Sequence, residues 1–125
     1  MNAKDMNAKD RGKELFDALR KENPKINIDG VVNEEKYHNS KYKIIYIMKE
    51  VNSGEGLDLR KGLNNGGRAQ TWNNTSRWTE GILNLEKEYL WDELEKNNEE
   101  RRDIFLKKIG VINLKKTAGG HTSIN

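Results

Sequence analysis

GVINLKKTAGGHTS, residues 110–123, has the pattern of a short strand that runs into a polar loop. Val111, Ile112 and Leu114 are apolar and suit a strand that is covered on both faces. Asn113 interrupts this apolar run, and a buried carboxamide without hydrogen-bond partners costs about 1–3 kcal/mol. We therefore expect Asn113 either to anchor the loop or to recognise a ligand.

The loop after this strand carries side chains that suit a phosphate or a base. Lys115 and Lys116 can neutralise phosphate, although two adjacent surface lysines are also ordinary. Gly119, Gly120 and His121 suit a backbone nest with an imidazole beside it. The loop matches neither the GxxxxGK[ST] nor the GxGxxG phosphate-binding pattern, so the expectation of a ligand depends on its composition.

The composition indicates one small domain. Of the 125 residues, 34% are hydrophobic and 34% are charged, and the mean hydropathy is −1.01. The net charge of +3 permits nucleic-acid binding without arguing for it. The sequence has no cysteine, which excludes disulfides and thiolate metal sites, and neither histidine lies in an HExxH or HxE motif. We therefore expect no metal and no cofactor.

The hydropathy pattern also bears on location. No apolar run approaches the roughly 20 residues that a membrane-spanning helix needs, and no signal-peptide pattern is present. We therefore expect a cytoplasmic monomer with no membrane partner.

The start of the chain repeats itself at once as MNAKDMNAKD. We interpret residues 1–12 as a disordered extension and residues 13–125 as the domain. Helical apolar spacing predicts a helix over residues 13–22, which Pro24 ends because it disfavours helical backbone at the residue before it. Residues 26–32 (INIDGVV) are a weaker candidate for a strand.

The middle of the chain predicts an α/β fold. Residues 42–48 (YKIIYIM) are β-branched and aromatic and form the clearest strand. Before the strand at residues 110–114, helical spacing predicts helices over residues 57–63, 70–85, 89–94 and 99–109. A strand, helices and a second strand predict a parallel pair with a right-handed crossover, as in a three-layer αβα fold with a parallel sheet. Ligands of such folds bind beyond the carboxyl ends of the strands.

Polar side chains follow the first of these strands directly. A carboxylate at Glu50 and a carboxamide at Asn52 can orient or deprotonate a water. The alternative is that Glu50 pairs with a nearby lysine and that Asn52 caps a turn.

A second unusual stretch, residues 66–78, gathers glycine, arginine and tryptophan. Gly67 permits close backbone approach, and Arg68 and Trp72 suit a phosphate and a stacked base. The alternative is that Trp72 belongs to the core and that the arginines are solvated.

Residues 44–54 (IIYIMKEVNSG) and 110–117 (GVINLKKT) resemble two motifs of the uracil-DNA glycosylase superfamily. In that superfamily one core strand ends in a motif with the water-activating Asp, Asn or Glu, and a later strand ends in an Asn that reads the uracil edge. The resemblance gives Asn113 the reading role. The first motif lacks the usual glycine and proline, so both Glu50 and Asn52 stay candidates for the water-activating role. The segment from Gly67 to Trp72 resembles the part whose aromatic stacks on the base.

This resemblance implies a base-excising hydrolase that acts on DNA, either uracil-containing or single-stranded. A flipped base would lie in the crevice, and a water would attack its glycosidic carbon. The superfamily's late histidine motif lies much further along the chain than His121. We therefore expect residues 13–125 to be the N-terminal part of such a domain, with an incomplete sheet and little activity alone.

Two other functions stay open. One is a non-catalytic nucleic-acid-binding module that uses arginines, lysines and a tryptophan for backbone and stacking contacts, namely Arg68, Trp72, Arg77, Lys115 and Lys116. The other is a small protein that binds a free nucleotide in the same crevice.

Overall fold

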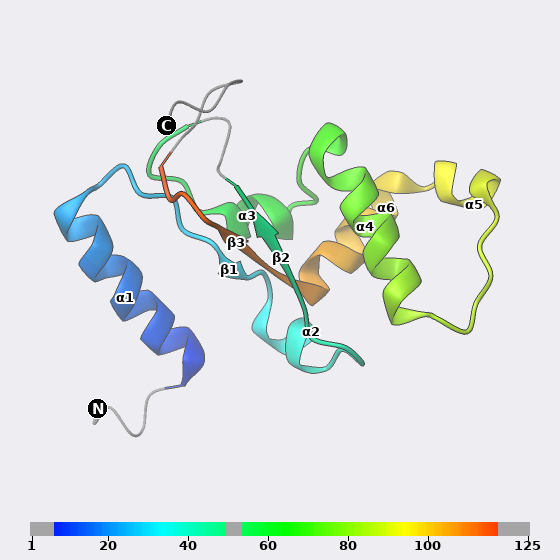
Figure 1. Cartoon of the computed structure of the whole chain (residues 1–125), viewed down its shortest axis with the longest axis horizontal. Helices are drawn as coiled ribbons and strands as arrows, with labels where there is room; N and C mark the ends of the chain where they lie inside the picture. The colour runs from blue at the N-terminus through cyan, green and yellow to red at the C-terminus, as the bar shows by residue number, and fades with distance from the viewer. Residues whose placement is uncertain (1–6, 50–53, 118–125) are drawn as a thin grey trace.

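The chain folds as helices around a small sheet (Figure 1). The structure is a computed structural model that describes residues 7–49 and 54–117. The helices are α1 (Ala8–Glu22), α2 (Glu34–His38), α3 (Leu59–Asn64), α4 (Ala69–Leu83), α5 (Trp91–Glu95) and α6 (Asn98–Phe105), which the 3₁₀ helix η2 (Leu106–Lys108) extends. The strands are β1 (Gly30–Val31), β2 (Ile44–Met48) and β3 (Ile109–Asn113). The chain therefore combines helices with a small three-stranded sheet, which agrees with the predicted α/β class.

The sheet has the strand order β1-β3-β2. Strands β2 and β3 are parallel, and their register runs from Ile44 opposite Ile109 to Met48 opposite Asn113. This confirms the predicted parallel pair and brings the carboxyl ends of the two strands side by side.

Strand β1 pairs antiparallel with β3, so the prediction of a wholly parallel sheet is wrong. The cause is the path of residues 27–32, which run back along β3 from its carboxyl end. The Asn27 N–H donates to the Lys116 carbonyl at 2.7 Å, and the Val32 N–H donates to the Ile109 carbonyl at 3.0 Å.

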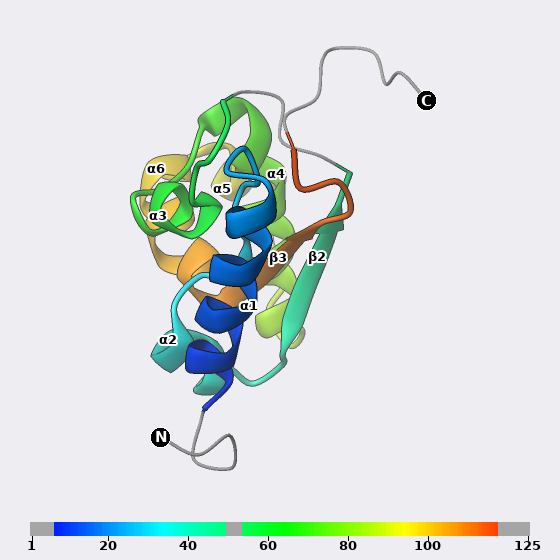
Figure 2. The same cartoon turned by 90° about the vertical axis from the view of Figure 1, so that its left-hand side faces the viewer.

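The core lies on one face of the sheet. Ile109 and Val111 of β3 are fully buried there against Leu63 of α3, Trp72 of α4 and Leu106 of η2. Alternate residues of a strand point to opposite faces, so Ile45 and Ile47 lie on the other face and are 48% and 68% exposed. Figure 2 shows β2 along one side of the molecule, with α3 and α6 toward the opposite side.

Two predicted boundaries need correction. Helix α1 begins at Ala8, because Asn7 caps it by accepting the Asp10 N–H at 2.8 Å, so residues 8–12 are helical and not a disordered extension. Residues 1–6 lie outside the described residues. The predicted helix over residues 99–109 ends in η2, and Ile109 already belongs to β3. The Ile109 side chain continues the apolar helical spacing because it faces the same core as the helix does.

A buried arginine ties the last helices together. Arg101 of α6 is 7% exposed, and its guanidinium donates to Glu80 of α4 at 3.2 Å. It also donates to the carbonyls of Glu93 at 3.1 Å and of Leu94 at 3.2 Å, which belong to α5. Arg77 of α4 also donates to the Leu94 carbonyl, at 2.9 Å, so two arginines hold α5 against α4 and α6.

Candidate functional site

Asn113 ends β3 beside the carboxyl end of β2, as the sequence predicted. It is 3% exposed, and its main-chain N–H donates to Asp29 Oδ2 at 2.8 Å. Its side-chain Nδ2 is buried and has no hydrogen-bond acceptor within the described ranges 7–49 and 54–117. The carboxamide therefore retains an unused donor, as a ligand-reading side chain must.

Asp29 and Lys116 form an ion pair next to Asn113. Lys116 Nζ donates to the same Asp29 Oδ2 at 2.6 Å. The Asp29 side chain is 4% exposed and that of Lys116 is 28% exposed. The predicted cation at Lys116 is therefore present at the site, but a carboxylate already partly neutralises it.

Asn27 is the fourth member of this cluster. It is 1% exposed, and its Oδ1 accepts the Leu57 N–H at 2.7 Å. Its Nδ2 is buried and, like that of Asn113, finds no acceptor in the part of the chain that the structure describes. We refer to Asn27, Asp29, Asn113 and Lys116 together as the strand-end cluster.

Sequence reasoning missed Asn27 and Asp29. The signal in residues 26–32 (INIDGVV) was the alternation of polar and apolar residues at Asn27, Ile28 and Asp29 in a short strand. All three residues are buried. Buried polar groups need partners, and those of the Asp29 carboxylate lie at the far end of the chain in Asn113 and Lys116.

The strand-end cluster has a definite chemical capacity. It presents two buried amide donors and a lysine–aspartate pair at the edge of the sheet where α/β folds bind ligands. Leaving a buried donor unsatisfied costs about 1–3 kcal/mol, so a ligand with acceptor atoms would recover that free energy. The cluster therefore suits an uncharged, acceptor-bearing group such as the edge of a base.

Several predicted site residues lie outside the described residues. They are the two candidates for holding a water, Glu50 and Asn52, and the loop residues Gly119, Gly120 and His121. Residues 50–53 directly follow the first residue after β2, and residues 118–125 follow Thr117. In the sequence, these predicted site residues therefore come shortly after the ends of β2 and β3.

Trp72 and Gly67 have structural roles. Trp72 is 6% exposed within the core, which is the alternative that the sequence left open. Gly67 has φ +63°, and a Cβ atom there would stand 2.8 Å from Trp72 Cδ1. The glycine is therefore explained by its backbone conformation and by the close tryptophan.

The remaining predicted residues lie at the surface. Arg68 is exposed where α4 begins, and its carbonyl accepts the Trp72 N–H at 2.9 Å. Lys115 is exposed, and its main-chain N–H donates to the Lys49 carbonyl at 2.8 Å. Lys115 thus lies at the carboxyl end of β2, on the same edge as the strand-end cluster.

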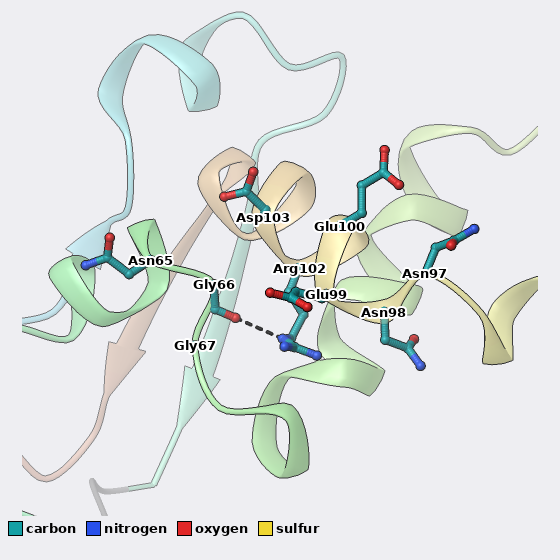
Figure 3. Close-up of a pocket in the computed structure, with 9 residues that line it drawn as sticks. All are labelled: Asn65, Gly66, Gly67, Asn97, Asn98, Glu99, Glu100, Arg102 and Asp103. Carbon is teal, nitrogen blue, oxygen red and sulfur yellow. Dashed lines mark hydrogen bonds between the residues drawn. The ribbon is translucent and has the colours of Figure 1, made fainter.

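A hollow lies apart from the strand-end cluster, between the turn after α3 and the start of α6 (Figure 3). It has a volume of about 830 Å³ and is open to solvent. Its lining includes Gly66, Gly67 and Arg102 together with the carboxylates of Glu99 and Asp103. Arg102 Nε already donates to the Gly66 carbonyl at 3.0 Å. The acidic lining disfavours phosphate, so this hollow is a weaker candidate than the strand-end cluster.

The described residues hold neither a membrane-spanning helix nor a metal-binding cluster. No helix in them is long and apolar enough to cross a membrane. Within the same residues, no group of three or more histidine or acidic side chains could hold a metal ion.

Comparison with known proteins gives no match. No protein-family model matches the chain, and neither does any curated protein or any solved structure.

Proposed function

We propose that this chain is a uracil-DNA glycosylase-like protein that binds a base at the strand-end cluster and hydrolyses its N-glycosidic bond in DNA. The observation that carries the proposal is the buried Asn113 with its unused Nδ2 donor at the carboxyl end of a parallel strand. The motif resemblance gives this asparagine the role of reading the base edge, which its burial and unused donor support.

The other roles follow from the same proposal. Glu50 or Asn52 holds the attacking water, because both closely follow β2 in the sequence and the motif resemblance gives one of them this role. Lys115 and Lys116 contact the DNA backbone. In the three-layer arrangement of that superfamily, helices also cover the sheet face that carries Ile45 and Ile47.

Uracil release from a labelled oligonucleotide tests the proposal. We expect the chain to release uracil from single-stranded DNA, slowly, and the Asn113→Ala and Glu50→Ala variants to reduce release by at least tenfold. Asn39→Ala is the matched control, because Asn39 is an exposed asparagine at the end of α2. Release that the Asn113 and Glu50 variants leave unchanged would refute the site assignment.

A non-catalytic base-binding module is the second candidate. The unused amide donors of Asn27 and Asn113 favour this candidate, because they suit the acceptor atoms of a base whether or not its glycosidic bond is broken. Binding to a uracil-containing single strand, weakened by salt and by Asn113→Ala but without uracil release, would select this function. Absence of both binding and release would exclude both functions.

A further inference from the structure

Strand β2 has an open edge. The strand order β1-β3-β2 gives β2 a single strand neighbour, β3, among the residues that the structure describes. The Met48 carbonyl faces β3, where it accepts the Leu114 N–H at 2.9 Å. Main-chain groups of successive strand residues point alternately to the two sides, so those of Ile45 and Ile47 face away from β3. The open edge therefore presents main-chain donors and acceptors with which an added strand can pair.

The sheet face away from the core is apolar beside this edge. Ile45 and Ile47 are exposed there, and Ile112 of β3, which lies opposite Ile47 in the register, is exposed next to them. Exposed apolar strands with a free edge are the usual template for pairing with another chain. An added strand would cover part of these isoleucine side chains as well as pair with the main chain.

Helix α4 flanks the same edge on the core side of the sheet. The Tyr46 hydroxyl of β2 lies 2.9 Å from Thr79 Oγ1 of α4. Glu80 lies on the flank of α4 that bonds to α6, and helical spacing places Trp78 and Ile82 on the opposite flank, past Thr79. These two side chains are 57% and 38% exposed. Figure 1 shows α4 on the side of β2 away from β3, so Trp78 and Ile82 border the open edge.

The two ends of β2 are basic. Residues 41–49 include Lys41, Lys43 and Lys49 and no acidic residue. Two of these lysines come before the strand and one directly follows it, and all three are exposed. A partner strand that carries acidic residues at its ends would complement these charges.

A second copy of this chain fits the edge poorly. Antiparallel pairing of Ile45 with Ile47 of the other copy would place Lys43 opposite Lys49 at both ends of the pair. Like charges directly opposite each other destabilise a sheet. Both copies would also bring an α4 helix to the same edge on the same side of the joined sheet. The geometry therefore favours a partner that contributes a single strand.

We propose that the open edge of β2 binds an extended segment of another protein as a fourth strand, with β-branched residues in its middle and acidic residues at its ends. Main-chain hydrogen bonds to Ile45 and Ile47 hold the segment, as when a peptide adds a strand to an exposed sheet edge. Its side chains alternate between Trp78 and Ile82 on the core side and the isoleucines on the other face. None of these residues belongs to the strand-end cluster, so strand binding does not depend on the proposed function.

Amide hydrogen exchange of the unaltered chain tests the main-chain pairing. The probe is a synthetic peptide with alternating valine and threonine residues between two pairs of aspartates. We expect this peptide to slow exchange of the Ile45 and Ile47 amides by at least tenfold, because their N–H groups gain acceptors. The matched control is the same peptide N-methylated at every valine and threonine, which cannot donate main-chain hydrogen bonds and should not bind.

Three results of this experiment would overturn the proposal. One is unchanged exchange at Ile45 and Ile47 in the presence of about 1 mM peptide. Another is equal slowing by the N-methylated peptide. The third is slowing that grows with protein concentration in the absence of peptide, which would assign the edge to a second copy of this chain.

Calorimetric titration with the same peptide tests the side chains and the charges. We expect Trp78→Ala to weaken binding about tenfold, and a peptide with lysines in place of the aspartates to bind at least tenfold more weakly. Trp91→Ala is the matched control, because Trp91 is 58% exposed on α5 beside Arg77, on the other flank of α4, and should leave affinity unchanged. Equal affinities of the two tryptophan variants, or of the acidic and basic peptides, would overturn the proposed partner.

Discussion

At the scale of single residues, Asp29 links the early and late segments of the chain that meet in the strand-end cluster. One carboxylate oxygen accepts from Lys116 Nζ at 2.6 Å and from the Asn113 N–H at 2.8 Å. In Asp29→Ala both donors lose their acceptor, so we expect the free energy of unfolding to fall by about 2 kcal/mol. Asp29→Asn keeps an acceptor for Asn113 and should lose less. Urea denaturation of both variants measures the difference.

The control for this prediction is another lysine–aspartate pair. Lys13 Nζ lies 2.7 Å from Asp17 Oδ2, but both side chains are well exposed. Exposed ion pairs contribute little to stability, so Asp17→Ala should leave the urea midpoint unchanged. An Asp29→Ala variant as stable as Asp17→Ala would mean that the buried pair does not hold the cluster together.

The same residues show what local sequence can and cannot predict about a site. Asn113 and Lys116 were predicted because an apolar run next to polar residues marks a strand end within a short window. Asp29 was missed because its partners lie 84 and 87 residues away, and no local pattern reports such a pairing. The core position of Trp72 was left open, because helical spacing alone does not distinguish a buried aromatic from one that lines a site.

At the scale of elements, the turn between α3 and α4 depends on Gly67. Its φ of +63° suits glycine, and an added Cβ would stand 2.8 Å from Trp72 and 3.1 Å from Leu63. We therefore expect Gly67→Ala to reduce the free energy of unfolding by about 1–3 kcal/mol. Thermal and urea unfolding measure it.

The matched control is Gly62→Ala within α3. A Cβ at Gly62 meets no atom within 4 Å, and alanine favours helix. This variant should be more stable by about 0.5–1 kcal/mol. If both variants changed stability in the same direction, the close contact with Trp72 would not be the reason for glycine at position 67.

The start of α3 gives a pH-dependent prediction. Partial burial raises the pKa of Asp58, but the hydrogen bonds and charge of Arg60 lower it by more, so the pKa lies below its usual range. A depressed carboxylate pKa stabilises the fold above the unfolded-state pKa of about 4 and loses that contribution as pH falls through the folded-state value. Asn caps a helix as well as Asp does. Asp58→Asn should therefore be less stable than the unaltered chain at pH 7, with a difference that closes in acid.

Urea unfolding, measured from pH 7 down through the folded-state pKa of Asp58, tests the prediction. Asp92→Asn, at the exposed first turn of α5, measures the effect of removing a carboxylate from a helix start alone. A stability difference for Asp58→Asn that stays constant from pH 7 to the acid limit would show that the ion pair with Arg60 does not stabilise the fold.

The elements differ in how far they were predictable. Strand β2 and helix α4 were predicted within a few residues, because β2 is rich in β-branched and aromatic residues and α4 has clear helical spacing. The direction of β1 was not, because two residues at Gly30–Val31 carry no information about which strand they join. The end of α6 was placed too late because Ile109 packs into the same core as the helix, so the apolar spacing continues across the boundary.

At the scale of the whole molecule, α1 stands apart from the other helices (Figure 1). It has no buried residue, and Leu15 is 59% exposed. Its connection to the rest depends on Arg20, whose guanidinium donates to the carbonyls of Ile26 at 3.1 Å and of Gly56 at 2.7 Å. A helix that buries so little apolar surface should open without unfolding of the core.

Amide hydrogen exchange tests this separation. We expect α1 amides to exchange much faster than those of Ile109 and Val111 in the unaltered chain. Arg20→Ala should speed exchange in α1 by at least tenfold and leave β3 unchanged, because the core on the sheet does not include α1. Lys21→Ala changes the next, exposed residue of the same helix and should have no such effect. Equal exchange in α1 and β3, or faster exchange in both together in Arg20→Ala, would instead make the molecule one cooperative unit in which α1 supports the strand-end cluster.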